Sequence, residues 1–289
     1  NTTIALTTSI VMGVLSFAER TVFNRCFIPD YLGLYSFFNN LVGIINTAEL
    51  GIGTSIAFAL YAPLEYGQKD QIAAIMHFFR KAYAIVGTIV LVIGVLIIPV
   101  MPMLLKTDID MHSVYIYYLF FLFRTVTNYY FGYKEILLSA NQEQYKVTFI
   151  TNMAWSILYV AEMIISVTTG NFLYYVIAIF TVNLIRAIIL NIKASRQFPE
   201  LRKYRNVKID RDSINHLKRN TGGLIITRLS SVLVTTTDSL LISAMVGTAF
   251  LGKYANYQMI TTGLMSISAL LPQSITASIG NAGVTESKR

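Results

Sequence analysis

The stretch AYAIVGTIVLVIGVLIIPVMPMLL (residues 82–105) indicates the class of this protein. It contains no charged residue, and its apolar side chains would surround a helix on all sides instead of forming one stripe. A hydrocarbon core about 30 Å thick needs roughly 20 helical residues to cross it. We therefore expect a transmembrane helix here.

The composition extends this interpretation to the whole chain. Of its 289 residues, 54% are apolar and 13% are charged, which is about half the charge of a soluble domain. The mean hydropathy is +0.56. These values exclude soluble enzymes, nucleic-acid-binding modules and disordered chains. We predict an all-α polytopic membrane protein with about eight spans, at 4–28, 33–62, 82–105, 113–133, 147–169, 171–193, 221–247 and 250–280.

Lysine and arginine are distributed unevenly between the two sides of these spans. The segment 193–219 contains nine of them, and alternation places it on the same side as the loops 63–81 and 134–146 and both chain ends. That side holds sixteen such residues, and the other holds Lys106 and Lys253. Because basic loops favour the cytoplasm, we expect a plasma (inner) membrane protein with a cytoplasmic N-terminus. The net charge of +8 then needs no nucleic-acid partner.

An offset of 219 residues relates the two ends of the chain. The pattern LG-x-Y at 32–35 recurs at 251–254, and the offset superposes the first two spans on the last two. This is the sign of a parallel repeat of six-helix units. The short connection at 169–171 predicts a tight hairpin between two spans inside the first unit.

The repeat divides the chain into two parts. We expect an N-terminal six-helix bundle over 1–219, with a basic cytoplasmic linker at 193–219, and the first two helices of a truncated second bundle over 220–289. The chain would then be a fragment of a protein of roughly 440 residues with at least twelve spans.

Several charged residues fall near the middle of the predicted spans, where each costs about 2.5–3.5 kcal/mol on insertion scales. They are Glu19, Arg20, Glu49, Arg124, Glu162 and Asp238. Two arrangements are open. The charges either line a polar cavity between bundles, formed by spans 1, 2, 4, 7 and 8, or form buried pairs such as Glu49–Arg124 and Glu162–Arg186. We favour the cavity because acids outnumber bases at this depth.

The two kinds of charge suit different ligands. A guanidinium binds phosphate oxygens bidentately and stays charged, so arginines near or within the membrane are candidate contacts for a diphosphate or another anion. These are Arg20, Arg25, Arg124 and Arg228. Carboxylates can bind a coupling proton or Na⁺, and the candidates are Glu19, Asp238 and Glu49.

The sequence contains few of the residue patterns that catalytic sites require. None of the three histidines falls inside a predicted span, and no metal-binding spacing or glycine-rich phosphate loop is present. We expect no enzyme, no metal and no cofactor.

Three short segments are similar to those of Wzx-type polysaccharide-biosynthesis flippases, in the multidrug/oligosaccharidyl-lipid/polysaccharide exporter superfamily. FIPDYLGLYS (27–36) resembles their outer turn into helix 2, and ELGIG (49–53) with Ser55 resembles the segment that follows. VGTAFLGKYA (246–255) resembles the matching turn between helices 7 and 8. The resemblance covers essentially all 289 residues.

This resemblance implies two six-helix bundles that alternate access to a central cavity. It implies a polyprenyl-diphosphate-linked oligosaccharide substrate, moved to the outer leaflet for capsule, exopolysaccharide or O-antigen-type synthesis. The four candidate arginines would contact the diphosphate, and the carboxylates would bind coupling H⁺ or Na⁺. Membrane lipids and the polysaccharide polymerase machinery are further implied partners.

Three other functions stay open. A drug/cation antiporter of the same superfamily would have an acid-dominated cavity, which Arg20 and Arg124 oppose. A membrane-embedded glycan-assembly enzyme would have a large outer loop, and the predicted outer loops are short. A scaffold without a transport role would pair all its mid-depth charges.

Overall fold

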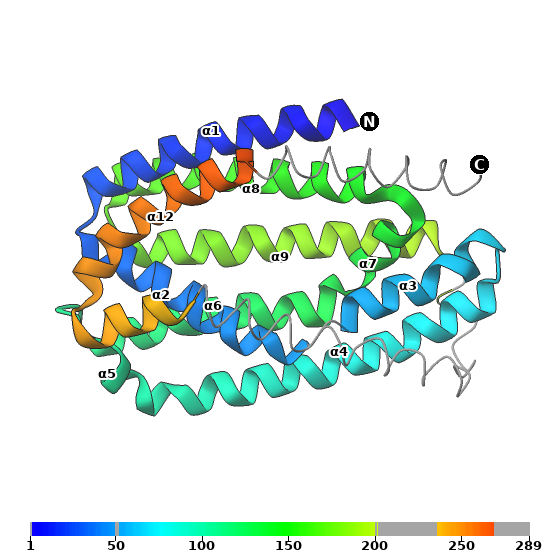
Figure 1. Ribbon diagram of the computed structural model, residues 1–289, viewed down its shortest axis with the longest axis horizontal. Coiled ribbons are helices and arrows are strands. Elements are labelled where there is room, and N and C mark those ends of the chain that lie inside the picture. The colour runs from blue at the N-terminus through cyan, green and yellow to red at the C-terminus, as the bar shows by residue number, and fades with distance from the viewer. Residues whose placement is uncertain (1, 50–51, 200, 202–235, 269–289) are drawn as a thin grey trace, which may run out of the picture.

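The computed structural model describes residues 2–49, 52–199, 201 and 236–268. Every regular element within these residues is a helix, so the predicted all-α fold is confirmed. The long helices run side by side along one direction (Figure 1). The first of them, α1 (Thr2–Cys26), starts at the top of that view, right of centre, and runs to the left.

Two helices replace the single span predicted over 33–62. Helix α2 (Pro29–Ile45) ends in a 3-10 turn, η1 (Asn46–Glu49), and α3 (Ile52–Glu65) follows. The polar run Asn46-Thr-Ala-Glu49 does not continue the α-helix, and a 3-10 turn inside a helical stretch often marks a functional break. Glu49 therefore lies at an interruption and not on a continuous helix.

The next helices follow the predicted apolar stretches more closely. Helix α4 (Lys69–Ile97) passes through η2 (Ile98–Val100) into the short α5 (Met101–Leu104), where Pro99 and Pro102 remove backbone donors. Beyond the next turn lie α6 (Met111–Phe131), η3 (Gly132–Lys134) and α7 (Glu135–Leu138). A π-helical turn, η4 (Ser139–Glu143), then leads into α8 (Gln144–Thr169).

A bend at η4 separates α6 and α7 from α8. Asn141 and Gln142 leave helical geometry there, and Gln142 has a φ of 59°. This angle lies in the left-handed region that non-glycine residues rarely adopt. Because of the bend, the chain reverses direction between the predicted spans at 113–133 and 147–169.

The predicted hairpin at 169–171 is confirmed. Gly170 ends α8 with a φ of 57°, which glycine adopts without steric cost. The side chain of Asn171 then accepts a hydrogen bond from the backbone N–H of Leu173 over 2.8 Å, at the start of α9 (Phe172–Gln197). Residues 236–245 are helical, and α12 (Thr248–Ser268) is the last described helix.

Three of the described helices are long and apolar enough to cross a membrane. They extend over Lys69–Leu104, Met111–Thr169 and Phe172–Gln197, and the second contains two of the predicted spans on either side of the bend. The predicted number of eight spans is therefore higher than the structure supports by this measure. Parts of the predicted spans at 221–247 and 250–280 lie outside the described residues.

The connections gather at the two ends of the bundle as the predicted alternation requires. Residues 27–28, 105–110, 170–171 and 246–247 lie at one end, which we call the Gly170 end, on the left in Figure 1. The connection between α3 and α4 and the bend at η4 lie at the opposite end, the Gln142 end.

Helices α2 and α12 pack closely through two glycines that the 219-residue offset relates. A Cβ atom on Gly33 would overlap the carbonyl oxygen of Thr248, and one on Gly252 would overlap that of Pro29. Residues 29 and 248 have the same offset, so the contact is reciprocal, as a two-fold relation between repeats would make it. Small residues at helix crossings in membranes allow this close approach.

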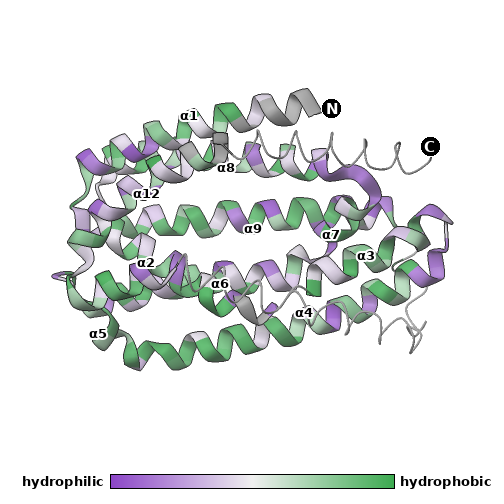
Figure 2. Cartoon of the chain, in the orientation of Figure 1, coloured by the Kyte–Doolittle hydropathy of each residue, from purple (hydrophilic) through white to green (hydrophobic). Residues whose placement is uncertain are grey.

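Apolar side chains also cover the outside of the bundle, for example Leu96 on α4 and Val167 on α8. Figure 2 shows hydrophobic residues along the C-terminal part of α4, on the left of the view, and hydrophilic ones gathered at the bend before α8. Apolar side chains on the outside suit contact with lipid. The backbone can lie there as well, because a helix satisfies its own backbone hydrogen bonds.

Candidate functional site

The structure brings four charged residues together in the interior of the bundle. We call them the charge cluster: Glu19 and Arg20 on α1, Arg124 on α6 and Glu162 on α8. Glu19 and Glu162 are only 4% and 2% exposed. The charges of the other three residues all act on Glu162. The cluster therefore assembles four of the six charges predicted near mid-depth.

Aromatic packing positions Glu19 within the cluster. Phe23, one helical turn further along α1, lies edge-on to Phe172 and Tyr175 of α9, with ring centroids 6.1 and 5.2 Å away. Tyr175 in turn donates its hydroxyl to Oε1 of Glu19 over 2.7 Å. A neutral donor thus replaces part of the hydration that the carboxylate loses on burial.

The two arginines of the cluster contact neutral groups. The guanidinium of Arg20 lies 5.8 Å from the ring centroid of Tyr35, and its buried Nε has no hydrogen-bond partner among the residues that the structure describes. Nη2 of Arg124 donates to Oδ1 of Asn39 over 2.8 Å, and its guanidinium lies 5.1 Å from the ring centroid of Phe121. Rings and amides of this kind hold a cation without cancelling its charge.

Ion pairs in the described residues lie elsewhere. Two pairs fall within 4.0 Å, Lys146–Glu143 at 2.7 Å and Arg186–Glu135 at 3.1 Å. The buried pairs Glu49–Arg124 and Glu162–Arg186, which were the alternative to a polar cavity, are therefore not formed. The reason is the direction of each side chain around its helix axis, which residue depth alone does not determine.

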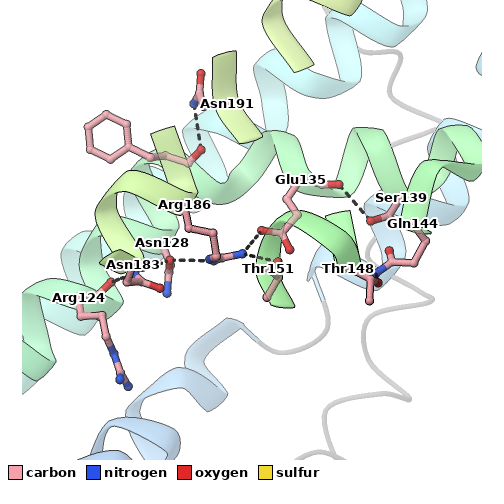
Figure 3. Close-up of polar contacts among 11 residues, drawn as sticks. Arg124, Asn128, Glu135, Ser139, Gln144, Thr148, Thr151, Asn183, Arg186 and Asn191 are labelled. Atoms are coloured by element: carbon pink, nitrogen blue, oxygen red, sulfur yellow. Dashed lines mark hydrogen bonds and ion pairs between the residues drawn. The ribbon is translucent and has the colours of Figure 1, made fainter. Parts of the chain in front are cut away.

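A second group of polar residues surrounds Arg186 on α9, and we call it the Arg186 network. Nη1 of Arg186 donates to Glu135 Oε2 over 3.1 Å and to Thr151 Oγ1 over 3.3 Å (Figure 3). Its Nη2 donates to Oδ1 of Asn128 over 3.4 Å, and Asn183 donates to the same oxygen over 3.0 Å. The network thus ties α6, α7, α8 and α9 together.

A pocket of about 380 Å³ lies beside this network. Glu49 lines it and accepts a hydrogen bond from the hydroxyl of Tyr83, while Tyr129 donates to Oδ1 of Asn46 over 3.1 Å. None of the described lining residues belongs to α1 or α12. The pocket is therefore inside the N-terminal helices and differs from the predicted cavity between spans 1, 2, 4, 7 and 8.

The remaining predicted site residues do not join the charge cluster. Arg25 is exposed near the end of α1. Asp238 is exposed as well and accepts a weak hydrogen bond from the hydroxyl of Tyr254 over 3.4 Å. Arg228 lies outside the described residues. The structure thus places Arg20 and Arg124 together, and leaves the grouping of all four arginines a prediction.

Two polar residues that contact the arginines were missed by the sequence prediction. Glu135 was assigned to a loop, although its carboxylate pairs with Arg186, and Asn39 was not recognised as the partner of Arg124. A charged residue one turn beyond an apolar span could have indicated Glu135. The described residues contain no group of three or more His, Cys, Asp or Glu side chains arranged to hold a metal ion.

Comparison with known proteins identifies the family of this chain. The sequence profile described as "Polysaccharide biosynthesis protein" matches residues 1–277. No curated protein and no solved structure gives a significant match. Because the profile covers nearly the whole of a chain built from apolar helices, this membrane protein belongs to the polysaccharide biosynthesis protein family.

Proposed function

We propose that this chain is part of a Wzx-type flippase, which moves polyprenyl-diphosphate-linked oligosaccharides from the inner to the outer leaflet of the plasma membrane. Membership of the polysaccharide biosynthesis protein family supports the proposal. The chain would contribute the N-terminal bundle of a carrier with alternating access and a cytoplasmic N-terminus. It would act with the polysaccharide polymerase machinery, and we assign it no catalytic step and no cofactor.

One observation carries this proposal. Arg20 and Arg124 lie among buried side chains, and no described carboxylate approaches either of them within 4.0 Å. Keeping a charge inside a membrane protein is costly, so such residues usually serve a ligand or an ion. Their guanidinium groups are suited to the oxygens of a diphosphate, which they can bind in pairs. We assign Arg25 and Arg228 as secondary candidates for the same contact.

The carboxylates of the charge cluster provide a way to couple transport to an ion. A diphosphate beside Glu19 and Glu162 meets two negative charges, and a proton or Na⁺ on one of them removes part of that repulsion. Binding of the ion and binding of the substrate then strengthen each other by the same factor. Glu19 is our first candidate for the coupling site, followed by Asp238 and Glu49.

A second candidate is a drug/cation antiporter of the same superfamily. The two buried acids of the charge cluster favour it, because a cationic substrate could replace the coupling ion there. Such a carrier would not need Arg20 or Arg124 for substrate binding. The same arginine variants therefore separate the two functions.

The test measures surface polysaccharide in cells whose polysaccharide export depends on this protein. The protein is expressed as the whole chain that the cell makes. We expect Arg20→Ala and Arg124→Ala to reduce export by more than about tenfold, since each removes a charge-assisted contact to the diphosphate. Lipid-linked oligosaccharide should accumulate on the inner leaflet. Arg196→Ala is the matched control, because Arg196 is an exposed arginine on α9 and none of the candidate contacts involves it. Normal export by both cluster variants, at wild-type levels in the membrane, would overturn the diphosphate assignment.

A further inference from the structure

A small pocket near the Gln142 end is lined by basic residues and lies apart from the charge cluster. Its volume is about 180 Å³. We call it the basic pocket, and its polar lining residues are His77, Arg80, Tyr133, Lys134 and Ser195. The rest of its described lining is apolar, and no Asp or Glu is among these residues. A pocket of this size and charge suits a single anionic group.

The donors of the basic pocket are held in place by the surrounding helices. Nζ of Lys134 donates to Oδ1 of Asn191 over 3.0 Å and to Oγ of Ser195 over 2.6 Å, so α9 anchors it at the pocket wall. Arg80 is exposed on α4 and lines the same pocket.

His77 supplies an unsatisfied buried group. Its Nε2 lies 2.9 Å from the carbonyl oxygen of Leu201, and a carbonyl can only accept, so Nε2 carries the proton. Its Nδ1 is buried and has no hydrogen-bond partner in the described part of the chain. With the proton on Nε2, Nδ1 can only accept, so a water molecule or a hydroxyl group of a bound ligand would satisfy it.

The depth of the pocket agrees with the position of lipid headgroups. Arg80 lies directly before the apolar stretch at 82–105, and Lys134 directly follows the apolar helix α6. Both residues therefore lie at the boundary of the hydrocarbon region, where the phosphates of a bilayer are found. The predicted orientation makes this the cytoplasmic boundary.

We propose that the basic pocket binds a phosphate group, held by Arg80 and Lys134, at the membrane boundary. The group is either the phosphate of an anionic phospholipid or free phosphate, since both present the same oxygens to these donors. Cationic side chains at this depth attract anionic headgroups. The site is separate from the charge cluster, so it does not depend on the proposed transport function.

The experiment compares the thermal stability of the purified full-length protein in two arms. In the first arm, nanodiscs of phosphatidylglycerol are compared with nanodiscs of phosphatidylcholine. In the second, inorganic phosphate is titrated against chloride at equal ionic strength in neutral detergent. The variant is Arg80→Gln, and the control is Lys81→Gln, an exposed basic residue next to it that does not line the pocket.

We expect the anion to raise the melting temperature of the wild type, and Arg80→Gln to weaken its binding by about tenfold, as expected for loss of a charge-assisted hydrogen bond. Lys81→Gln should stay within about twofold of the wild type, because surface charge alone contributes little. A shift in the first arm alone identifies a lipid headgroup, and a shift in the second identifies free phosphate. No shift in either arm, or equal losses in both variants, would overturn the proposal.

Discussion

The charge cluster and the Arg186 network lie in the same bundle, but their charges are compensated differently. In the network, a guanidinium meets a carboxylate at 3.1 Å. In the charge cluster, the described contacts of the guanidinium groups are rings and an amide, and Glu19 accepts from a tyrosine. Along α9, Tyr175 and Arg186 are separated by about 16 Å of helix rise.

This difference separates structural from ligand-binding charge. Removing one partner of a direct, partly buried pair such as Arg186–Glu135 lowers stability, because the remaining charge is then uncompensated. Charges that contact only neutral groups contribute less to folding and remain available to a ligand or an ion. We therefore expect substitutions in the Arg186 network to change stability, and substitutions in the charge cluster to change transport.

The largest stability effect should come from Arg186→Ala. This change leaves Glu135 without its cation and Thr151 without its donor, while Asn128 keeps the hydrogen bond from Asn183, and we expect the free energy of unfolding to fall by about 2 kcal/mol. The matched change Arg124→Ala should cost less than about 1 kcal/mol, because the hydrogen bond lost to Asn39 is offset by removal of a buried charge. Denaturant unfolding in detergent, followed by circular dichroism, measures both. Equal losses would remove the distinction between the two regions.

A smaller effect is expected from coupling between charges. In a double-mutant cycle, Glu135→Gln and Arg186→Gln should show a coupling energy of about 1–2 kcal/mol, as residues in direct contact do. The corresponding cycle of Glu162→Gln and Arg124→Gln should give less than about 1 kcal/mol, because the two charges act on each other without a direct ion pair. Strong coupling in the second cycle would show that the charge cluster is a structural pair after all.

The smallest effect is expected at two tyrosines that donate hydrogen bonds to carboxylates, one to a buried carboxylate and the other to a carboxylate that lines a pocket. Tyr175→Phe removes a hydrogen bond to a fully buried Glu19 and should cost about 1 kcal/mol in unfolding free energy. Tyr83→Phe removes the bond to Glu49, which lines a pocket where water can replace the hydroxyl, so its cost should be about half as large. The same unfolding assay compares the two. A larger loss for Tyr83→Phe would indicate that the pocket is dry.

Much of the architecture could be predicted because it depends on local properties of the chain. Apolar stretches of about 20 residues predict helices wherever they occur. The hairpin at 169–171 followed from glycine and asparagine in a short connection, and the two ends of the bundle followed from alternation. The broken span at 33–62 was missed, because hydropathy does not distinguish a continuous helix from two helices joined by a 3-10 turn.

The sequence by itself therefore determined the helical membrane class, the order of the long helices and the set of charges that enter the bundle. Only the tertiary structure decided the contacts of these charges. It placed Arg186 beside Glu135 and Arg124 beside Asn39, and left Arg25 exposed. The physical reason is that side-chain contacts depend on the rotation of each helix about its axis and on its neighbours in the bundle, and packing between distant segments determines both.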